Sequence, residues 1–488
     1  MPELPSPARI DNPAAPSASV AIIGGGLAGL AAGCALVESG FRVTVFERRP
    51  YVGGRASSYQ HPGTGEIVDN CQHVLLGCCT NLIAFYQRLG VQDKIRWYEQ
   101  LTFLEPGGRA SILRPSGLPA PFHMTPAFLG ADCLGLADKA SLSYAMAMLT
   151  RKTPKDSGKT FLSWLREHHQ TEQAIQRFWK PVLVSALNEE LDCASIPSAA
   201  QVIRESFLNS AEAGRMGVPT VPLTELYGAA GEYIQARGGE VRLRSAVESF
   251  EPQADSVKLL AGGREMIFDY LIPATPFDAL SKMLPPTPDT DSLRSALKKF
   301  ETSPITGIHL WFDREITELD HAVLLDRTIQ WMFHKSKLLQ DGRGRPSLHR
   351  SDGSSAEADK SYVELVVSAS KSLVDKSRAE IIELAVKELR EFFPKAREAS
   401  LIKSTVIKEV HATYSPQPGA DDYRPRSTTA WPRIFLAGDW TATGWPATME
   451  GAVRSGYSAA EHVARASGRP NKFLVADLPR AGLMKLFK

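Results

Sequence analysis

The chain has 488 residues, of which 43% are hydrophobic and 23% charged, and a formal net charge of +2. This length suffices for two domains with large cores, and the composition is ordinary for a globular protein. The near-neutral charge indicates neither nucleic-acid binding nor an acidic partner. Six cysteines show no metal-ligand spacing and no secreted framework, so we predict reduced thiols, no metal site and a cytoplasmic location.

The chain begins with a predicted tail and an uncharged stretch. Residues 1–18 are rich in proline, alanine and serine, which predicts a mobile tail. Residues 17–37 carry no charge and have roughly the length of a membrane span. Three consecutive glycines, and the lack of a basic segment before an apolar core, instead favour a buried strand followed by a buried helix.

A glycine motif follows this first strand. The apolar run 20–23 leads directly into Gly24-x-Gly26-x-x-Gly29, and a helical pattern continues over 27–39. Gly24 permits a sharp turn off the strand, Gly26 lets the backbone approach a pyrophosphate, and Gly29 lets the helix pack closely on the sheet. The N–H groups at the helix N-terminus then offer a binding site for phosphate oxygens.

A second predicted strand, residues 42–46, ends at Glu47. This carboxylate comes about 18 residues after Gly29, where dinucleotide-binding folds place an acid that accepts hydrogen bonds from the adenosine ribose. A glycine triad alone is weak evidence, but here the strand, the helix and the acid are all in place. The spacing therefore predicts a βαβ unit that binds a dinucleotide.

Two motifs near opposite ends of the chain indicate which dinucleotide it is. Residues 47–57, with Gly54 and Arg55, resemble the signature after the second strand in the flavin amine oxidase and carotenoid desaturase superfamily. In that superfamily the Gly-Gly-Arg turn contacts the FAD pyrophosphate. Residues 434–452 resemble its closing motif, in which an aspartate, here Asp439, reaches the ribityl and phosphate side of FAD.

The resemblance implies FAD as the cofactor. A helix N-terminus near residue 447 also suits the flavin N1/O2 edge, where negative charge grows on reduction. In the superfamily the residue at Val247 passes its backbone over the adenine; the alternative is an ordinary buried valine. The cofactor-binding residues that we predict are Gly24, Gly26, Leu27, Ala28, Gly29, Glu47, Arg48, Gly54, Arg55, Val247, Gly438, Asp439, Thr448 and Met449.

The predicted fold class is α/β, with a Rossmann-like FAD-binding domain of the glutathione-reductase-like, amine oxidase type. It is interleaved with a substrate domain made of a mixed sheet and helices. We assign residues 19–100, 220–285 and 401–470 to the FAD-binding domain, and residues 101–219 and 286–400 to the substrate domain. Within the latter, residues 98–105 predict one strand, residues 171–188 and 198–209 predict helices, and residues 336–360 predict an exposed loop.

Beyond the superfamily, four segments resemble the squalene-associated FAD-dependent desaturases, a family of hydroxysqualene dehydroxylases in bacterial squalene and hopanoid synthesis. The segments are 69–79, 178–181, 309–313 and 438–451. The resemblance implies reductive dehydroxylation of a C30 allylic alcohol, hydroxysqualene, by hydride from reduced flavin. That reaction needs an acid for the departing hydroxyl and a dry apolar tunnel.

Two residues are candidates for the acid, His73 and Glu450. A histidine between apolar residues is more often structural, but the resemblance places the segment of His73 near the flavin. The segment 177–188 has two compatible interpretations, a bundle core and the lining of a lipid-shaped cavity.

Three other functions remain open. A carotenoid-type desaturase would use the same site oxidatively, taking hydride from a polyene such as phytoene or squalene. An amine oxidase would need a lysine near flavin N5, whereas the polar residue in the region 308–312, one place where that lysine was sought, is His309. A prenyl-lipid carrier would use the fold without flavin chemistry, which the intact cofactor motifs disfavour.

The predicted partners are an isoprenoid lipid substrate and an external electron donor, because the sequence shows no second nucleotide fingerprint. The tail 471–488 mixes apolar and basic residues. It predicts a terminal segment that is docked on the body or disordered, and the alternative is a contact with a membrane surface, on the inner face of the cytoplasmic membrane.

Overall fold

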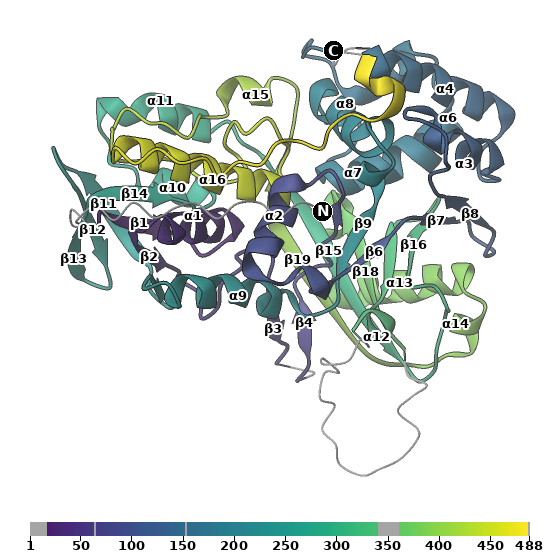
Figure 1. The fold of residues 1–488 in the computed structure, drawn as a ribbon. Coiled ribbons are helices and arrows are strands. Elements are labelled where there is room, and N and C mark those ends of the chain that lie inside the picture. Colours follow the sequence, from purple (N-terminus) through teal and green to yellow (C-terminus); the bar gives the residue numbers. More distant parts are fainter. Residues whose placement is uncertain (1–16, 63–64, 152–153, 340–360, 487–488) are drawn as a thin grey trace, which may run out of the picture.

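The structure, a computed structural model, describes residues 17–62, 65–151, 154–339 and 361–486 (Figure 1). Most of the predicted mobile tail, residues 1–16, therefore lies outside the described residues. The first layer is a four-stranded parallel sheet in the order β10 (Glu240–Arg242), β2 (Arg42–Phe46), β1 (Ser19–Ile23) and β14 (Tyr270–Pro273). Strand β1 is apolar and buried from Val20 to Ile23 because both faces of this sheet are covered.

Alternate residues of β1 enter two different cores. Val20 and Ile22 pack with α1 (Leu27–Glu38), α9 (Leu223–Gln235), α2 (Thr80–Leu89) and α16 (Met449–Ala466). Ala21 and Ile23 pack on the other face, against β11 (Val247–Pro252), β12 (Val257–Ala261), β13 (Arg264–Phe268), α10 (Phe277–Met283) and α11 (Pro288–Leu297). The uncharged stretch 17–37 is thus a strand and a helix, as predicted. No helix in the described part of the chain is long and apolar enough to cross a membrane.

The second layer is a seven-stranded mixed sheet. Its order is β19 (Leu401–Tyr414), β15 (Thr302–Phe312), β18 (Ser361–Ser368), β17 (Trp331–His334), β16 (His321–Leu324), β7 (Leu101–Leu104) and β8 (Ala110–Leu113). Only the β16–β7 pair among these is parallel. Because β19 pairs with β15 along its length, the predicted domain boundary at residue 401 is wrong, and the chain returns to the FAD-binding domain only after Tyr414.

The period of two along β18 gives the second sheet two different faces. Val363, Leu365 and Val367 pack against α13 (Arg378–Phe392), which covers the outer face, with α14 (Lys395–Glu398) following it. Val366 and Ser368 alternate with them and line a large internal cavity. The sheet therefore forms one wall of the candidate site.

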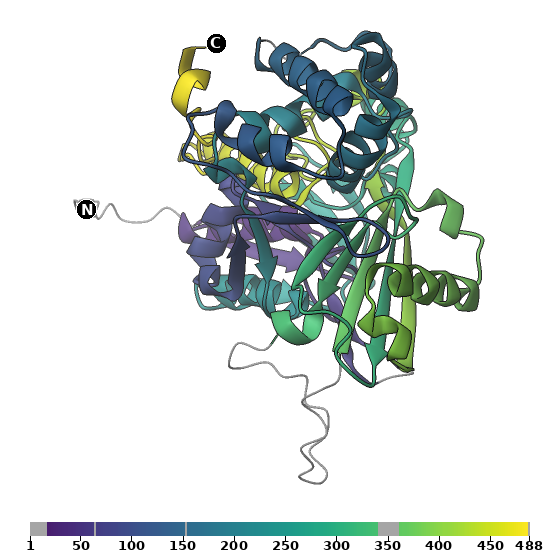
Figure 2. The same ribbon diagram turned by 90° about the vertical axis from the view of Figure 1, so that its right-hand side faces the viewer.

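A group of helices forms the corner of the molecule above this sheet (Figures 1 and 2). They are α3 (Thr125–Gly130), α4 (Leu136–Arg151), α5 (Phe161–Glu167), α6 (Glu172–Ala174), α7 (Lys180–Leu187) and α8 (Ile196–Ile203). Two of the predicted helices are not continuous, because π-helical turns interrupt them at Ile175–Trp179 and Arg204–Leu208. Such turns widen the helix by one residue and occur often at functional sites.

Short elements connect the layers. Strands β5 (Leu75–Leu76), β9 (Met216–Pro219) and β6 (Ile95–Tyr98) form one small sheet, and β3 (Ser58–Gln60) pairs with β4 (Ile67–Asp69). Two predictions need correction here. The single strand predicted at 98–105 is two strands, β6 and β7, and the loop predicted at 336–360 begins as a helix, α12 (Lys335–Leu338). The remainder of that loop, residues 340–360, lies outside the described residues.

The C-terminal segment is docked on the body, as predicted. Val475 N–H donates to Asn81 Oδ1 at 2.9 Å, Arg454 forms an ion pair with Asp477, and Met484 is fully buried in the core of the helical corner. The C-terminal segment therefore joins the FAD-binding domain, through Asn81 and Arg454, to the helical corner, through Met484. Earlier in the chain, α15 (Ala420–Tyr423) precedes the closing motif.

The contact of α1 with α16 makes a first prediction. A Cβ atom at Gly456 would lie 2.1 Å from the carbonyl oxygen of Ala28. Because that oxygen belongs to the backbone of α1, the clash can be relieved only if the two helices move apart. We expect Gly456→Ala to destabilise the protein by about 1–3 kcal/mol and to lower its thermal midpoint. In the control Gly228→Ala on α9, where the new Cβ meets nothing within 4 Å, the midpoint should stay or rise. Equal midpoints in the two variants would contradict the packing described.

Candidate active site

A large cavity lies between the two domains, with a volume of about 780 Å³. One part is lined by the glycine loops and by residues at the end of β2, and another by the seven-stranded sheet and the helical corner. Its wall is more apolar than polar, as in pockets that take an extended organic ligand. The polar groups concentrate in the part that the sequence motifs form.

Two glycine turns face one another in the first part. Gly53 N–H donates to Gly25 O at 2.8 Å, and this contact brings Gly54 against Gly26. A Cβ on Gly54 would lie 3.0 Å from the Gly26 Cα, whereas one on Gly26 would meet no atom nearer than 3.9 Å. The missing side chain of Gly26 therefore leaves open space on the cavity side, where the backbone can approach a ligand closely.

Glu47 lies buried at the end of β2 and lines the same part of the cavity. Its Oε2 accepts from Gly25 N–H at 2.7 Å, and its Oε1 accepts from Arg49 N–H at 2.8 Å. These bonds fix the carboxylate beside the first glycine turn and leave lone pairs for further donors. The position suits the two hydroxyl groups of a ribose.

An ion pair joins the two FAD motifs. Arg55 Nη2 lies 2.7 Å from Asp439 Oδ1, and Arg55 Nη1 donates to Ala412 O at 2.6 Å. Burial acts to lower the pKa of Arg55, but the Asp439 carboxylate raises it above its ordinary value overall. The guanidinium thus stays positive at the place where the sequence predicts a pyrophosphate.

Helix α16 begins at the cavity wall. Thr448 is its N-cap and accepts from Gly451 N–H at 3.1 Å, and Met449 Sδ accepts from Tyr227 Oη at 3.2 Å. The positive end of the helix dipole is therefore directed toward the cavity. This is the environment that favours a ligand atom which gains negative charge.

The structure brings nearly all of the predicted cofactor residues together. Gly29 is the exception, since a Cβ there would lie 2.0 Å from Gly24 O and its role is close packing. The others form part of the cavity wall: Gly24, Gly26, Leu27, Ala28, Glu47, Arg48, Gly54, Arg55, Val247, Gly438, Asp439, Thr448 and Met449. Individual contacts of these side chains with FAD stay predictions.

His73 also lies in the cavity wall. Its Nδ1 lies 2.8 Å from Cys71 O, and because a carbonyl only accepts, Nδ1 carries the proton. Burial lowers the pKa of His73 below its ordinary value, against the opposing influences of the Cys71 carbonyl and Asp69. The neutral ring keeps a lone pair at Nε2, so His73 suits the acceptance of a proton better than the predicted donation of one.

The prediction that Glu450 is an acid does not agree with its contacts. Its Oε1 accepts from Asn81 N–H and Asn81 Nδ2, both at 3.1 Å, and its Oε2 accepts from Leu82 N–H at 2.8 Å. Arg454 Nε adds an ion pair at 2.6 Å. The fully buried carboxylate therefore caps the N-terminus of α2 and ties it to α16, which is a structural role.

The apolar part of the cavity supports both interpretations of the segment 177–188. Phe178 and Trp179 are buried in the helical core, whereas Pro181, Val182 and Ser185 line the cavity. Apolar side chains from the sheet and from the second π-helical turn complete this wall: Leu101, Phe103, Phe207, Ile305, Val323, Trp331, Phe333 and Val366.

One carboxyl group interrupts the apolar wall and was not identified from the sequence. Glu205, in the second π-helical turn, lines the cavity, and its Oε2 accepts from Asn209 Nδ2 at 3.0 Å. Burial raises the pKa of this carboxyl above its ordinary value, which makes it easier to protonate. No local pattern marks this residue, because its neighbours predict an ordinary helix.

His309, found where an amine-oxidase lysine was sought, is fully buried, and its Nδ1 contacts Tyr362 Oη at 2.8 Å. Burial lowers the pKa of His309 to about 3. A buried lysine does exist nearby, Lys335, but it is not among the cavity-lining residues, and it pairs with Asp69 at 2.8 Å. The lysine therefore belongs to a buried charge cluster with Asp69 and Glu364 behind the cavity wall.

Comparison with known proteins places the chain in a family. The model of the flavin containing amine oxidoreductase family matches residues 27–464, and the chain belongs to that family. It is 27% identical to a 15-cis-phytoene desaturase of Synechococcus elongatus, over 92% of this chain and 98% of the other. It is 26% identical to a probable zeta-carotene desaturase of the same organism, over 91% and 98% of the two chains.

Solved structures share the fold. An oxidoreductase from Methanosarcina mazei aligns with a TM-score of 0.69 at 17% identity, over 91% of this chain and all of the other. The predicted fold class and the predicted cofactor are thus confirmed: the protein has the flavin amine oxidase fold and is an FAD-dependent oxidoreductase. The open space at Gly26, the buried Glu47 and the positive Arg55 fit FAD.

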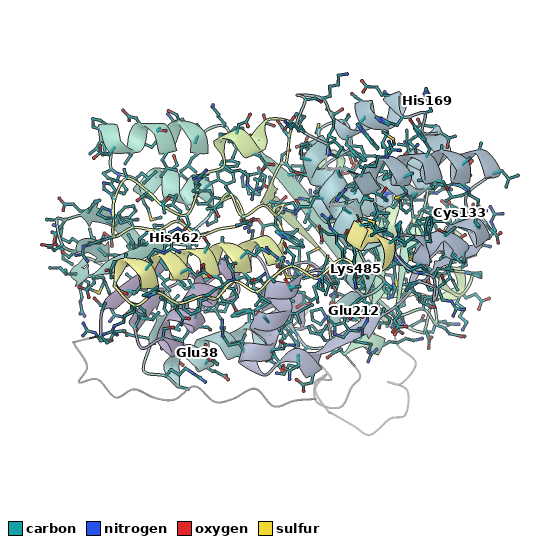
Figure 3. All side chains as sticks on the ribbon, turned by 45° about the horizontal axis from the view of Figure 1, so that its top comes forward. Glu38, Cys133, His169, Glu212, His462 and Lys485 are labelled. Carbon is teal, nitrogen blue, oxygen red and sulfur yellow. The ribbon has the colours of Figure 1, made fainter. Side chains whose placement is uncertain are left out.

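The Glu47 carboxylate makes a second prediction. Glu47→Ala removes the carboxylate that we predict to accept hydrogen bonds from the adenosine ribose. We therefore expect this variant to bind FAD roughly 10- to 100-fold more weakly. Titration of apoprotein with FAD, followed by flavin fluorescence, measures the change. Glu38→Ala is the matched control, since Glu38 lies at the end of α1 and pairs with Arg88 away from the cavity (Figure 3). Equal affinities in the two variants would exclude the assigned role of Glu47.

Proposed function

We propose that this protein transfers hydride between FAD and a long isoprenoid hydrocarbon, in the oxidative direction, and so introduces a carbon–carbon double bond. The observation that carries the proposal is the continuity of the cavity. One wall is built from the cofactor motifs, and the next is a lobe of aromatic and aliphatic side chains with few polar groups. A substrate without polar groups suits such a lobe.

The residues of this chain have defined tasks in such a reaction. Bound between the two glycine turns and the N-terminus of α16, FAD would supply the acceptor for a hydride from one substrate carbon. Loss of a proton from the neighbouring carbon then forms the double bond, and this step needs a base. His73 supplies one, because its Nδ1 proton is engaged by Cys71 O and its lowered pKa keeps Nε2 unprotonated near neutral pH.

The similarity to known proteins supports the same direction. The relatives reported above carry the names phytoene desaturase and zeta-carotene desaturase, and their similarity extends over nearly the whole chain. A carotenoid-type substrate, which is a long unsaturated isoprenoid, is therefore our leading candidate. The reduced flavin would return its electrons to an external redox partner. An amine substrate is less well supported, because the described cavity wall is largely apolar.

A second candidate is the reductive dehydroxylation of hydroxysqualene, which the sequence motifs favoured. It needs a proton donor for the departing hydroxyl group, and Glu450 is already engaged with α2. Glu205 supports this candidate, because it is a carboxyl group with a raised pKa in the apolar wall. A protonated Glu205 can donate to a hydroxyl oxygen, and the carbon cation that forms is then quenched by hydride.

Two anaerobic incubations test the candidates against each other. In the first, oxidised protein receives phytoene or zeta-carotene, and bleaching of the flavin absorbance together with a more unsaturated product supports desaturation. In the second, reduced protein receives hydroxysqualene, and the return of the yellow flavin together with squalene supports dehydroxylation. If neither mixture changes the flavin, both candidates are wrong.

His73→Ala tests the assigned base. We expect flavin reduction by the polyene to slow by roughly 10²- to 10⁴-fold. In the unchanged protein this rate should fall as the pH drops through the pKa of His73, because the protonated ring has no lone pair to offer. His462→Ala is the control, since its Nδ1 makes a similar contact, with Ser458 O at 2.7 Å, on the distant part of α16 (Figure 3). An unchanged rate in His73→Ala removes it from the mechanism.

We also propose that the helical corner contacts a membrane that contains anionic lipids. Leu129, Leu136 and Leu486 have exposed fractions of 61%, 87% and 78%, and Lys139 and Lys485 lie in the same segments. The C-terminal segment meets residues 118–139, since Leu483 N–H donates to Ala120 O at 2.8 Å. Exposed leucines beside lysines fit a bilayer with negative headgroups.

This surface lies close to the substrate lobe. Ala481 N–H donates to Asn209 O at 2.8 Å, and Asn209 directly follows the π-helical turn that contributes Glu205 and Phe207 to the cavity wall. A lipid substrate could then enter from the bilayer without crossing water. The sequence suggested a membrane contact by the tail 471–488 alone. The proposed surface also includes residues 118–139.

Sedimentation with lipid vesicles checks this contact. We expect the protein to bind vesicles of phosphatidylcholine and phosphatidylglycerol. The double variant Leu129→Ser/Leu486→Ser should reduce the bound fraction several-fold, because insertion of each leucine side chain into the bilayer contributes about 1.5–3 kcal/mol. Ile267→Ser is the control, with an exposed fraction of 67% on β13 of the other domain. Equal loss in both variants, or binding that needs no anionic lipid, would contradict the proposed surface.

A further inference from the structure

A cluster of charged side chains lies directly behind the segment that carries His73. Lys335, at the start of α12, is enclosed by Asp69 of β4 and Glu364 of β18, with side-chain exposed fractions of 3%, 5% and 0%. Its Nζ lies 2.8 Å from Asp69 Oδ2, 3.5 Å from Glu364 Oε2 and 2.7 Å from Gln72 Oε1. Burial of three charges is expensive, so their retention needs a reason.

The three charged groups are satisfied to different extents. Asp69 is saturated, because its Oδ1 also accepts from Ser58 Oγ at 2.6 Å and from Leu223 N–H at 3.1 Å. Glu364 is held less closely: neither of its oxygens has a well-formed hydrogen bond among the described residues, and Lys335 Nζ lies 3.5 Å from its Oε2. Burial raises the pKa of Glu364 to about 7, and the attraction of Lys335 only partly opposes this. Glu364 therefore changes its charge near neutral pH.

The cluster is connected to His73 by a short path. Lys335 Nζ donates to Gln72 Oε1, and Gln72 Nε2 donates to His73 O at 2.9 Å. Gln72 and His73 both line the cavity, whereas Lys335 and Glu364 do not. The lysine thus holds the backbone of His73 from outside the cavity wall.

The charges that act on the His73 ring come from four places. Asp69 and the Cys71 carbonyl raise the pKa of His73, while Arg55 and Lys335 lower it, in addition to the effect of burial. Arg55 belongs to the cofactor part of the site and is already paired with Asp439. Lys335 differs from Arg55, because it contacts Asp69, Glu364 and Gln72 and none of the predicted cofactor-binding residues.

We propose that Lys335 is a positioning residue for His73, which holds its backbone through Gln72 while the lysine charge opposes that of Asp69. This inference rests on the proposed function in one respect, the role of His73 as the base. It adds that the base is tuned from outside the cavity by a lysine 262 positions further along the chain.

The test measures the titration of His73 directly. The FAD-bound protein is prepared with ¹³C,¹⁵N-labelled histidine, and the signal of His73 among the 11 histidines is identified by its loss in His73→Asn. In Lys335→Met we expect the midpoint of this titration to rise by about one pH unit, because a positive charge is lost beside the retained Asp69. The acid limb of flavin reduction by the polyene should move in the same direction.

A second variant guards against a folding defect. Lys335→Met leaves two carboxylates without a cation, but Lys335→Met/Asp69→Asn leaves only Glu364, whose burial favours the neutral form of the carboxyl. Since the removed charges oppose one another, the His73 midpoint should return close to that of the unchanged protein. Lys337→Met, on the same helix but paired with Glu315 at the surface, is the matched control and should leave the titration unchanged.

The outcomes separate this inference from the proposed function. If the His73 midpoint rises in Lys335→Met and the rate profile follows it, both stand. If the midpoint rises but the rate profile does not follow, Lys335 tunes His73 and the assigned base is wrong. If the midpoint stays in place in a folded, FAD-bound Lys335→Met protein, or if Lys337→Met shifts it equally, the inference is overturned.

Discussion

The contact between Arg55 and Asp439 is the interaction on which the rest of the site depends. Its two side chains are 384 positions apart in the chain, yet they form an ion pair at 2.7 Å in which Asp439 is buried and Arg55 is partly exposed. Removal of Arg55 would leave the buried Asp439 carboxylate without its cation, so the ion pair couples the two cofactor motifs. Once they are together, the second glycine turn, the closing strand segment and the N-terminus of α16 all border one cavity.

The second constraint is the interleaving of the two domains. The chain leaves the nucleotide sheet twice and builds the seven-stranded sheet and the helical corner before it returns. The cavity forms at the boundary between the two domains, where ligand sites are common. Because β15 is hydrogen-bonded to β18 and β19 along most of its length, these three strands form a continuous wall of the substrate lobe.

Local patterns were enough to predict the nucleotide site, because each of its signals lies within one strand, turn and helix. The glycine motif, Glu47 and the closing motif lie where the sequence placed them. Groups defined by distant partners were not predicted correctly. Glu450 is next to a predicted helix start, but nothing local shows that the N-terminus of α2 lies against it. Lys335 likewise belongs to a segment that looks like a polar loop, and its partners come from β4 and β18. The π-helical turn at Glu205 leaves no periodic trace.

The core around α1 has a consequence for how the protein is made. It contains residues from Val20 through to Phe473, so its first and last members are separated by nearly the whole polypeptide. On the ribosome, the N-terminal βαβ unit emerges early but has no α16 to cover it. Its apolar face must wait, exposed or shielded by a chaperone, until translation is almost finished. The complete cofactor site, which needs both the first glycine turn and the closing motif, can consequently form only when nearly the whole chain has been synthesised.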